Sequence, residues 1–158
     1  MATLKDVKAR IATVLQTVPG IGRVYARMRP VNLQSVEISD FVADGVLNCC
    51  FVQRGSADFE GKGGDTPPLV SQWDVISVHA FYAVQDSSSS EDIFDLLVDQ
   101  MLWAILTDSV YPKFLAQTVK RSRVPKLKTV DFRRFGPSAV LCHHAEITIQ
   151  VMTQTSNS

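Results

Sequence analysis

Apolar residues recur at intervals of three and four positions in two stretches of the chain, which is the spacing of an amphipathic helix. The first stretch predicts a helix over residues 4–18. This helix is expected to end at Pro19, which cannot extend it, and at Gly20 and Gly22, which can adopt the positive φ of a chain reversal. The pattern therefore predicts that the domain begins with a helix and a tight turn.

The second stretch predicts a helix over residues 86–108. It begins with serines that are followed three positions later by acids, Ser88 by Glu91 and Ser89 by Asp92, which is the capping-box pattern. These early acids also suit the positive end of the helix dipole. The predicted apolar face of the helix consists of Ile93, Leu96, Leu97, Met101, Ala104 and Ile105.

Runs of alternating or branched apolar residues predict strands over residues 23–31, 45–54, 71–85 and 139–151. Two segments lack such a pattern. Glycine, proline and charged residues dominate 55–70, which predicts a long surface loop of the kind that often carries contacts. Residues 109–138 include Pro112, Pro125 and Pro137 and are predicted to be irregular.

The order of these elements predicts an α+β domain, because adjacent strands without crossover helices favour antiparallel pairing. We expect a mostly antiparallel sheet of about four strands with two main helices packed on one face. A chain of 158 residues suits one hydrophobic core. A single domain is therefore predicted over residues 1–152, followed by a frayed tail over residues 153–158.

Composition restricts the class of protein. The 16 basic and 16 acidic side chains cancel, so net charge does not indicate binding to nucleic acid or to a membrane. The three cysteines include the adjacent pair Cys49 and Cys50 and suit a reducing compartment as small buried residues. The sequence has neither a signal-peptide pattern nor an apolar run long enough to span a membrane. These features predict a soluble intracellular protein.

The last predicted strand places several metal-binding residue types close together. Side chains alternate along a strand, so His143 is predicted to pack inward, while His144 and Glu146 share the other face with Cys142 and meet solvent or a neighbouring subunit. A zinc site needs three or four ligands, and the remaining histidine, His79, would have to lie beside them. His144, Glu146 and His79 are therefore weak metal candidates, and we expect no cofactor.

Other catalytic motifs are incomplete. The glycine spacing around Gly61 and Lys62 does not fit a phosphate-binding loop, and Gly20 and Gly22 follow a predicted helix rather than a strand. There is no Gly-x-Ser-x-Gly elbow for a nucleophilic serine. The sequence gives no catalytic constellation, and we do not expect an enzyme.

Charge is separated along the chain. Six acids and no bases lie between Asp86 and Asp108, whereas eight bases and one acid lie between Ser109 and Arg134. The basic segment could fold back on its own acidic helix, or it could meet the acidic helix of the next subunit in a head-to-tail ring. It could also line a pore through which DNA passes. The candidate interface residues are Lys113, Lys120, Arg121, Arg123, Lys126, Lys128, Arg133, Arg134, Glu91, Asp92, Asp95 and Asp99.

The sequence contains "VPGIGRV", "ARMRP", "QWDVISVHAFYAV", "SSSSEDIFDLLVDQMLWAIL" and "FRRFGPSAVLCHHAEITIQV", in that order. Over residues 4–152 this order of elements resembles the tail terminator (tail completion) proteins and related minor tail proteins in the neck of long-tailed bacteriophages. The resemblance implies a structural virion protein that forms a hexameric ring, caps the tail tube, stops tube polymerisation and joins the tube to the head-proximal connector.

The resemblance also implies a location and partners. The protein would be assembled in the bacterial host cytoplasm and reside in the tail neck, contacting the tail tube protein and connector or stopper proteins while double-stranded DNA passes through the lumen without specific binding. The candidate tube or connector contacts in the 55–70 loop are Phe59, Glu60, Lys62 and Asp65. A head-side stopper and a metal-dependent hydrolase that uses His144, Glu146 and His79 are the alternatives.

Overall fold

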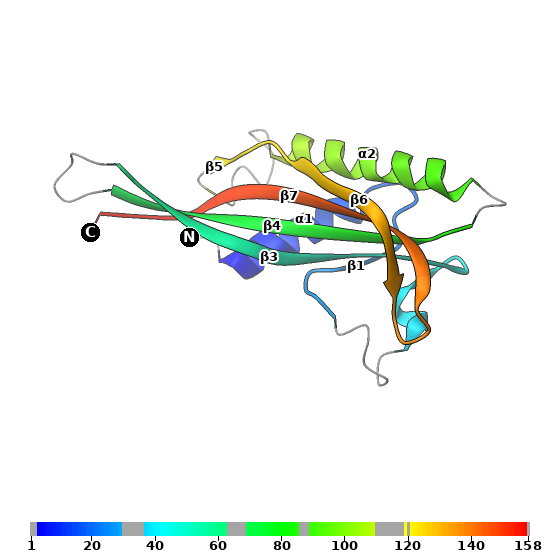
Figure 1. The fold of residues 1–158 in the computed structure, drawn as a ribbon. Helices are drawn as coiled ribbons and strands as arrows, with labels where there is room; N and C mark the ends of the chain where they lie inside the picture. The colour runs from blue at the N-terminus through cyan, green and yellow to red at the C-terminus, as the bar shows by residue number, and fades with distance from the viewer. Residues whose placement is uncertain are drawn as a thin grey trace.

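A computed structural model describes residues 3–29, 37–62, 69–85, 89–109, 119 and 121–157. Two helices lie on one face of a mostly antiparallel sheet (Figure 1). The described elements are α1 (Leu4–Leu15), β1 (Arg23–Tyr25), the 3-10 helix η1 (Ile38–Phe41), β2 (Val42–Ala43), β3 (Val46–Lys62), β4 (Leu69–Ala83), α2 (Ser90–Asp108), β5 (Arg121–Ser122), β6 (Lys126–Phe135) and β7 (Val140–Asn157).

Within the described residues the sheet has seven strands, in the order β1-β3-β4-β7-β5, with β2 beside β3 and β6 beside β7. Only the β1–β3 pair is parallel, and the other pairs are antiparallel. The predicted α+β class is confirmed, but the expectation of about four strands was too low. Of the additional strands, β5 and β6 come from the segment predicted to be irregular, and β2 from a stretch for which no element was predicted.

The first helix begins one residue after Thr3. The Thr3 side chain accepts a hydrogen bond from the backbone N–H of Asp6, and the Asp6 carboxylate accepts one from the backbone N–H of Thr3. This capping box satisfies donors that the helix itself leaves unpaired. The helix ends at Leu15, earlier than predicted, and the turn that follows places Gly20 at φ +79°.

The start of α2 differs from the prediction. Ser89 adopts a left-handed conformation with φ 53°, and its side chain makes no capping hydrogen bond, so the expected box with Asp92 is absent. Ser88 lies outside the described residues. Ser90 instead accepts a hydrogen bond from the backbone N–H of Gln85 and lies 2.9 Å from His143 Nε2. Ser90 therefore connects the start of the helix to the sheet.

The buried face of α2 is rotated relative to the predicted one. Phe94 and Val98 are buried beside Leu97, Met101 and Ile105, whereas Ile93 and Leu96 are 45% and 59% exposed. Because α2 has apolar residues on several sides, its periodicity alone did not identify the side that contacts the sheet.

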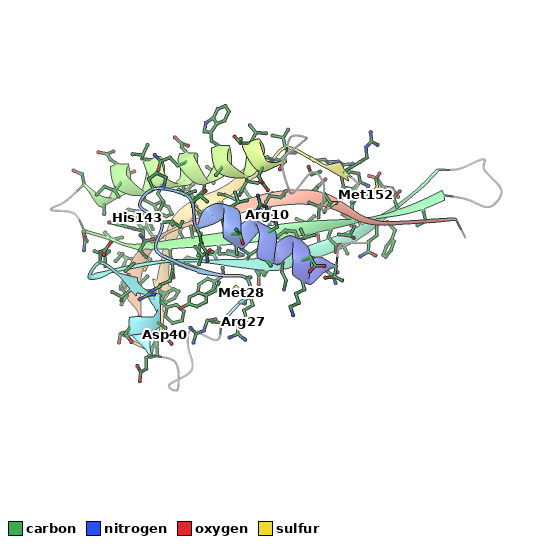
Figure 2. All side chains as sticks on the ribbon, turned by 180° about the vertical axis from the view of Figure 1, so that it is seen from behind. Arg10, Arg27, Met28, Asp40, His143 and Met152 are labelled. Carbon is green, nitrogen blue, oxygen red and sulfur yellow. The ribbon has the colours of Figure 1, made fainter. Side chains whose placement is uncertain are left out.

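The main core lies between the helices and the sheet. It contains α1 residues such as Ile11 and Leu15, α2 residues such as Met101 and Ile105, and branched residues from the central strands. Arg10 of α1, labelled in Figure 2, also pairs with Asp108 at the end of α2. Its Nη2 lies 2.7 Å from Asp108 Oδ1, which connects the two helices directly.

A second, smaller core lies on the opposite face of the sheet, called here the second face. It contains the rings of Phe41 from η1, Phe51 from β3 and Phe135 from β6, with Phe41 and Phe135 centroids 5.1 Å apart. Cys49 and Cys142 are buried with them. This end of the sheet is therefore covered on both faces, which the sequence pattern did not predict.

The predicted loop over residues 55–70 is mostly a β-hairpin. β3 continues to Lys62 and pairs with β4 from Leu69 onward, with a register shift between Arg54 and Ser56. Residues 63–68 lie outside the described part of the chain. β7 runs beside this hairpin to Asn157, so the predicted frayed tail is a strand and only Ser158 is not described. The three strands extend beyond the helices as an arm (Figure 1).

The irregular segment predicted at 109–138 contains β5 and β6, which both pair with β7. The charged residues of this segment concealed the alternation of Val130 and Phe132 with polar neighbours. The strand predicted over 23–31 is shorter and ends at Tyr25.

Among the described residues, neither helix has the length and apolar character of a membrane span.

Candidate functional site

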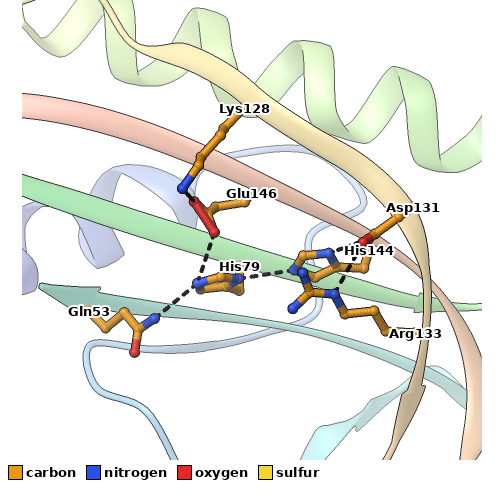
Figure 3. A network of polar contacts seen from close by, with 7 residues as sticks. All are labelled: Gln53, His79, Lys128, Asp131, Arg133, His144 and Glu146. Atoms are coloured by element: carbon orange, nitrogen blue, oxygen red, sulfur yellow. Dashed lines mark hydrogen bonds and ion pairs between the residues drawn. The ribbon is translucent and has the colours of Figure 1, made fainter. Parts of the chain in front are cut away.

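A row of four polar side chains crosses the second face, one from each of four adjacent strands (Figure 3). Gln53 Nε2 of β3 lies 3.0 Å from His79 Nε2 of β4, and His79 Nδ1 lies 3.0 Å from His144 Nε2 of β7. His144 Nδ1 lies 2.6 Å from Asp131 Oδ1 of β6. Gln53, His79, His144 and Asp131 are called the histidine row.

Three charged side chains flank the histidine row. Glu146 Oε1 lies 3.7 Å from His79 Nε2, and the other oxygen of this carboxylate lies 3.2 Å from Lys128 Nζ. Arg133 Nε lies 3.3 Å from Asp131 Oδ2. Each end of the imidazole pair therefore has a carboxylate, and each carboxylate also has a cationic partner from β6.

The hydrogen bonds assign a protonation state to each ring. A carboxylate only accepts, so His144 Nδ1–H donates to Asp131. His144 Nε2 then accepts from His79 Nδ1–H, and His79 Nε2 accepts from the amide of Gln53. All three bonds are satisfied with both rings neutral, and all three donors point in one direction along the row.

Burial favours these neutral rings. His144 is 0% exposed and contacts the Phe81 ring. Burial lowers the pKa of His144 and of His79, because desolvation disfavours the charged imidazolium, although nearby Asp131 and Glu146 oppose this effect. Despite partial desolvation, hydrogen bonds from His144 and Arg133 lower the pKa of Asp131.

The structure corrects one prediction about the last strand. His143 packs inward as predicted, beneath α2 and against the Phe94 ring (Figure 2). His144, however, does not face solvent, because the second core and β6 cover it. Glu146 is partly buried beside His79, its cross-strand partner.

The three weak metal candidates, His79, His144 and Glu146, are thus brought together. Their geometry does not form a metal centre, since all four ring nitrogens are engaged along the row by other side chains of the protein. Across the described residues no group of three or more histidine, cysteine or acidic side chains is arranged to hold a metal ion.

The separated charges occupy opposite sides of the molecule. Glu91, Asp92, Asp95 and Asp99 are exposed on α2, which packs on the sheet through other residues. On β6, Lys126 and Arg133 project from the second face, because their cross-strand partners on β7 alternate in step with His144. Lys128 lies at a register shift and reaches Glu146 on the same face. No ion pair connects the α2 acids with these bases in the described part of the chain.

Some of the predicted interface bases have partners within the chain. Lys128 and Arg133 pair with Glu146 and Asp131, and Arg123 pairs with Glu60. Arg134 donates to the backbone carbonyl of Ala139. Arg121 and Lys126 are exposed and have no acidic partner among the described residues, and Lys113 and Lys120 lie outside them.

An exposed apolar edge on β6 was not predicted from the sequence. Leu127, Val130 and Phe132 lie on the helix side of β6, and Phe132 is 62% exposed although its ring lies 5.2 Å from that of His143. The alternation of these residues with charged neighbours was the signal that could have revealed both the strand and its apolar face.

The predicted tube-contact residues fall on the arm. Phe59 is 68% exposed, and Glu60 is held by Arg123 with 3.2 Å between Oε1 and Nη2. Lys62 ends β3, and Asp65 lies outside the described residues. Of the two predicted contact residues whose side chains are described, Phe59 is the more exposed.

Comparison with known proteins gives no family assignment: no protein-family model matches the chain, and no curated protein matches it.

Proposed function

We propose that the protein is a structural assembly subunit, a tail terminator that forms a hexameric ring at the end of a phage tail tube. The observation that carries this proposal is the position of the acidic helix α2 and the basic β5–β6 edge on opposite sides of one chain. Among the described residues no ion pair joins these two surfaces within a subunit, whereas contact between successive subunits would bring them together.

Such a contact is heterologous, because two different surfaces meet. It forms a closed ring when repeating the rotation between neighbouring subunits returns to the first subunit. Ile93 and Leu96 lie among the α2 acids, and Leu127 and Val130 lie on the same edge strand as the β6 bases but on its helix side. Each charged surface therefore has exposed apolar side chains nearby. Apolar contact contributes affinity, and complementary charge selects the orientation.

The arm supports a role at the tube or the connector. It extends beyond the helices as three paired strands and presents Phe59 (Figure 1). Its ordered backbone is suited to docking, since less conformational freedom is lost on binding than with an unpaired loop. Under this proposal the protein resides in the virion neck, with the tail tube protein and connector or stopper proteins as partners.

Electron microscopy of tails assembled with and without the protein tests the function. Without it, tails should continue beyond their normal length, because nothing stops tube polymerisation. Tails of normal length in its absence would exclude a terminator. Recovery of the protein with DNA-filled heads rather than with tubes would identify a head-side stopper instead.

Charge reversal tests the ring contact. Arg121→Glu with Lys126→Glu reverses the basic edge, and Asp95→Lys with Asp99→Lys reverses the acidic helix. Each double variant should fold, because exposed charges contribute about 0–1 kcal/mol per pair, but should not form rings on tubes. Lys5→Glu, on the exposed side of α1, is the matched control and should form rings.

Mixing the two double variants should restore rings, because every contact in an alternating ring then joins opposite charges. A hexamer has an even number of subunits and can alternate in this way. Ring formation by either double variant alone, or no recovery in the mixture, would contradict the proposed contact.

A further inference from the structure

Beyond the proposed structural role, we infer that His79 and His144 form a single proton-binding site, in which one proton is shared by two rings between the carboxylates of Glu146 and Asp131. The ligand is a proton taken from solvent. The site is built from two pairs of strands, β3 with β4 and β6 with β7, and it lies beside Lys128 and Arg133 of the basic β6 edge.

The neutral row has one position that can take up a proton. His144 Nδ1 and His79 Nδ1 already carry hydrogens, and His144 Nε2 accepts one of them. His79 Nε2 is the remaining basic nitrogen, and it lies at the end of the row near Glu146 and Gln53. A solvent proton therefore binds at His79 Nε2.

Protonation changes the partners of His79. Its Nε2–H now donates toward Glu146 Oε1, 3.7 Å away, and the Gln53 amide must turn because two donors cannot face each other. Glu146 then shares its carboxylate between His79 and Lys128. Acidification thus adds a side-chain contact between β4 and β7, and the contact between Gln53 of β3 and His79 of β4 persists only with the amide oxygen as the acceptor.

The bond between the rings allows the positive charge to be shared. When the hydrogen on His79 Nδ1 transfers across the 3.0 Å contact to His144 Nε2, the imidazolium becomes His144, which donates to Asp131. A second proton would place an N–H on each side of that contact. The pair therefore binds one proton and excludes another while the contact is intact.

The charged groups that face the pair come from two strands. β7 contributes Glu146, and β6 contributes Asp131, Arg133 and Lys128. β3 contributes the uncharged amide of Gln53. The carboxylates stabilise the protonated pair, and the cations destabilise it. Replacing a carboxylate should therefore lower the pH at which the pair titrates, and replacing a cation should raise it.

Nitrogen NMR of histidine-labelled full-length protein tests the site between pH 8 and pH 4. At pH 8 both rings should carry hydrogen on Nδ1, and on acidification both should change together with a total uptake of one proton. His143, which contacts Ser90 instead, is an internal reference. Hydrogen on Nε2 of either ring at pH 8, or one full proton bound to each ring in the folded protein, would overturn the inference.

Two variants give a second measurement. Glu146→Gln should lower the pH at which the pair titrates, and Lys128→Met should raise it, because the first removes a nearby negative charge and the second a positive one. Lys126→Met, an exposed change on the same strand, should leave it unchanged. Circular dichroism establishes that each variant is folded. If Glu146→Gln does not fold, the test depends on the pH at which the pair titrates in Lys128→Met compared with Lys126→Met. The same titration pH in these two variants would overturn the inference.

Discussion

The guanidinium carbon of Arg123 lies 4.2 Å from the centroid of the Trp73 ring. Arg123 also pairs with Glu60 of the arm and hydrogen bonds to Gln150 of β7. Arg121, two residues earlier, is exposed and has no such contacts in the described part of the chain. Although both arginines belong to the basic segment, the Arg123 side chain is held by contacts within the chain, whereas the Arg121 side chain is exposed and can contact a partner.

This difference predicts unequal effects on stability. Arg123→Ala should lower the free energy of unfolding by about 0.5–2 kcal/mol, the range for a cation–π contact from exposed to desolvated sites. Arg121→Ala should change it by less than about 0.5 kcal/mol. Urea unfolding followed by circular dichroism measures both. Equal losses would show that the Trp73 contact contributes nothing specific.

Gly22 should be far more sensitive than its neighbours to substitution by alanine. A Cβ atom there would lie 1.9 Å from the backbone oxygen of Asn48, so Gly22→Ala must displace β1 from β3 and should cost about 3 kcal/mol or more. Gly20→Ala has free space but a positive φ and should cost about 1 kcal/mol.

Gly61→Ala on the arm is the matched control for these glycine variants. It has neither a close neighbour nor a positive φ and should be near neutral. Chemical denaturation ranks the three variants. If Gly61→Ala lowered the free energy of unfolding as much as Gly22→Ala, the steric explanation would be contradicted.

Acid should destabilise the fold through the histidine row. The pKa values of His79 and His144 are lowered in the folded protein, so below about pH 6.5 the unfolded chain binds more protons than the folded one. The free energy of unfolding should therefore be greatest above that pH and fall as the pH decreases toward the folded pKa values.

Denaturation at pH 7.5 and pH 5.5 measures this dependence. A variant carrying His79→Gln and His144→Gln should lose less stability between the two pH values than the unmodified protein, whatever its stability at pH 7.5. An equal loss would assign the acid sensitivity to other groups.

The three cysteines should be unreactive in the native protein. All are buried as free thiols, and burial raises the pKa of Cys50 and of Cys142 to about 12. The thiolate is the reactive form, so a thiol reagent at pH 8 should label the folded protein only as fast as it unfolds, and should label three thiols in denaturant. Rapid labelling of any cysteine without denaturant would contradict the burial.

Several elements could be predicted from the local sequence, because the patterns that specify them span only a few residues. The spacing of Val7, Ile11 and Leu15 identified α1, and Pro19 with Gly20 marked the turn after it. The inward position of His143 followed from strand alternation. The α+β class followed from the order of helices and strands.

Other features depended on pairing between distant segments. The arm is a hairpin because β3, β4 and the end of β7 satisfy one another's backbone hydrogen bonds, whatever their polar side chains. β6 likewise forms by backbone pairing with β7, and its charged side chains hid this strand from the sequence pattern. The buried side of α2 was decided by the sheet beneath it, since Ile93 and Phe94 are both apolar but only Phe94 meets β7.

The candidate site shows the same division. The sequence by itself determined the residue types of the histidine row and which residues share a strand face. Only the tertiary structure placed His79 beside His144 and covered the second face with Phe41 and Phe135. Alternation specifies the face of a strand on which a side chain lies, but burial of that face depends on what packs against it, and here η1 and the end of β6 come from distant parts of the chain.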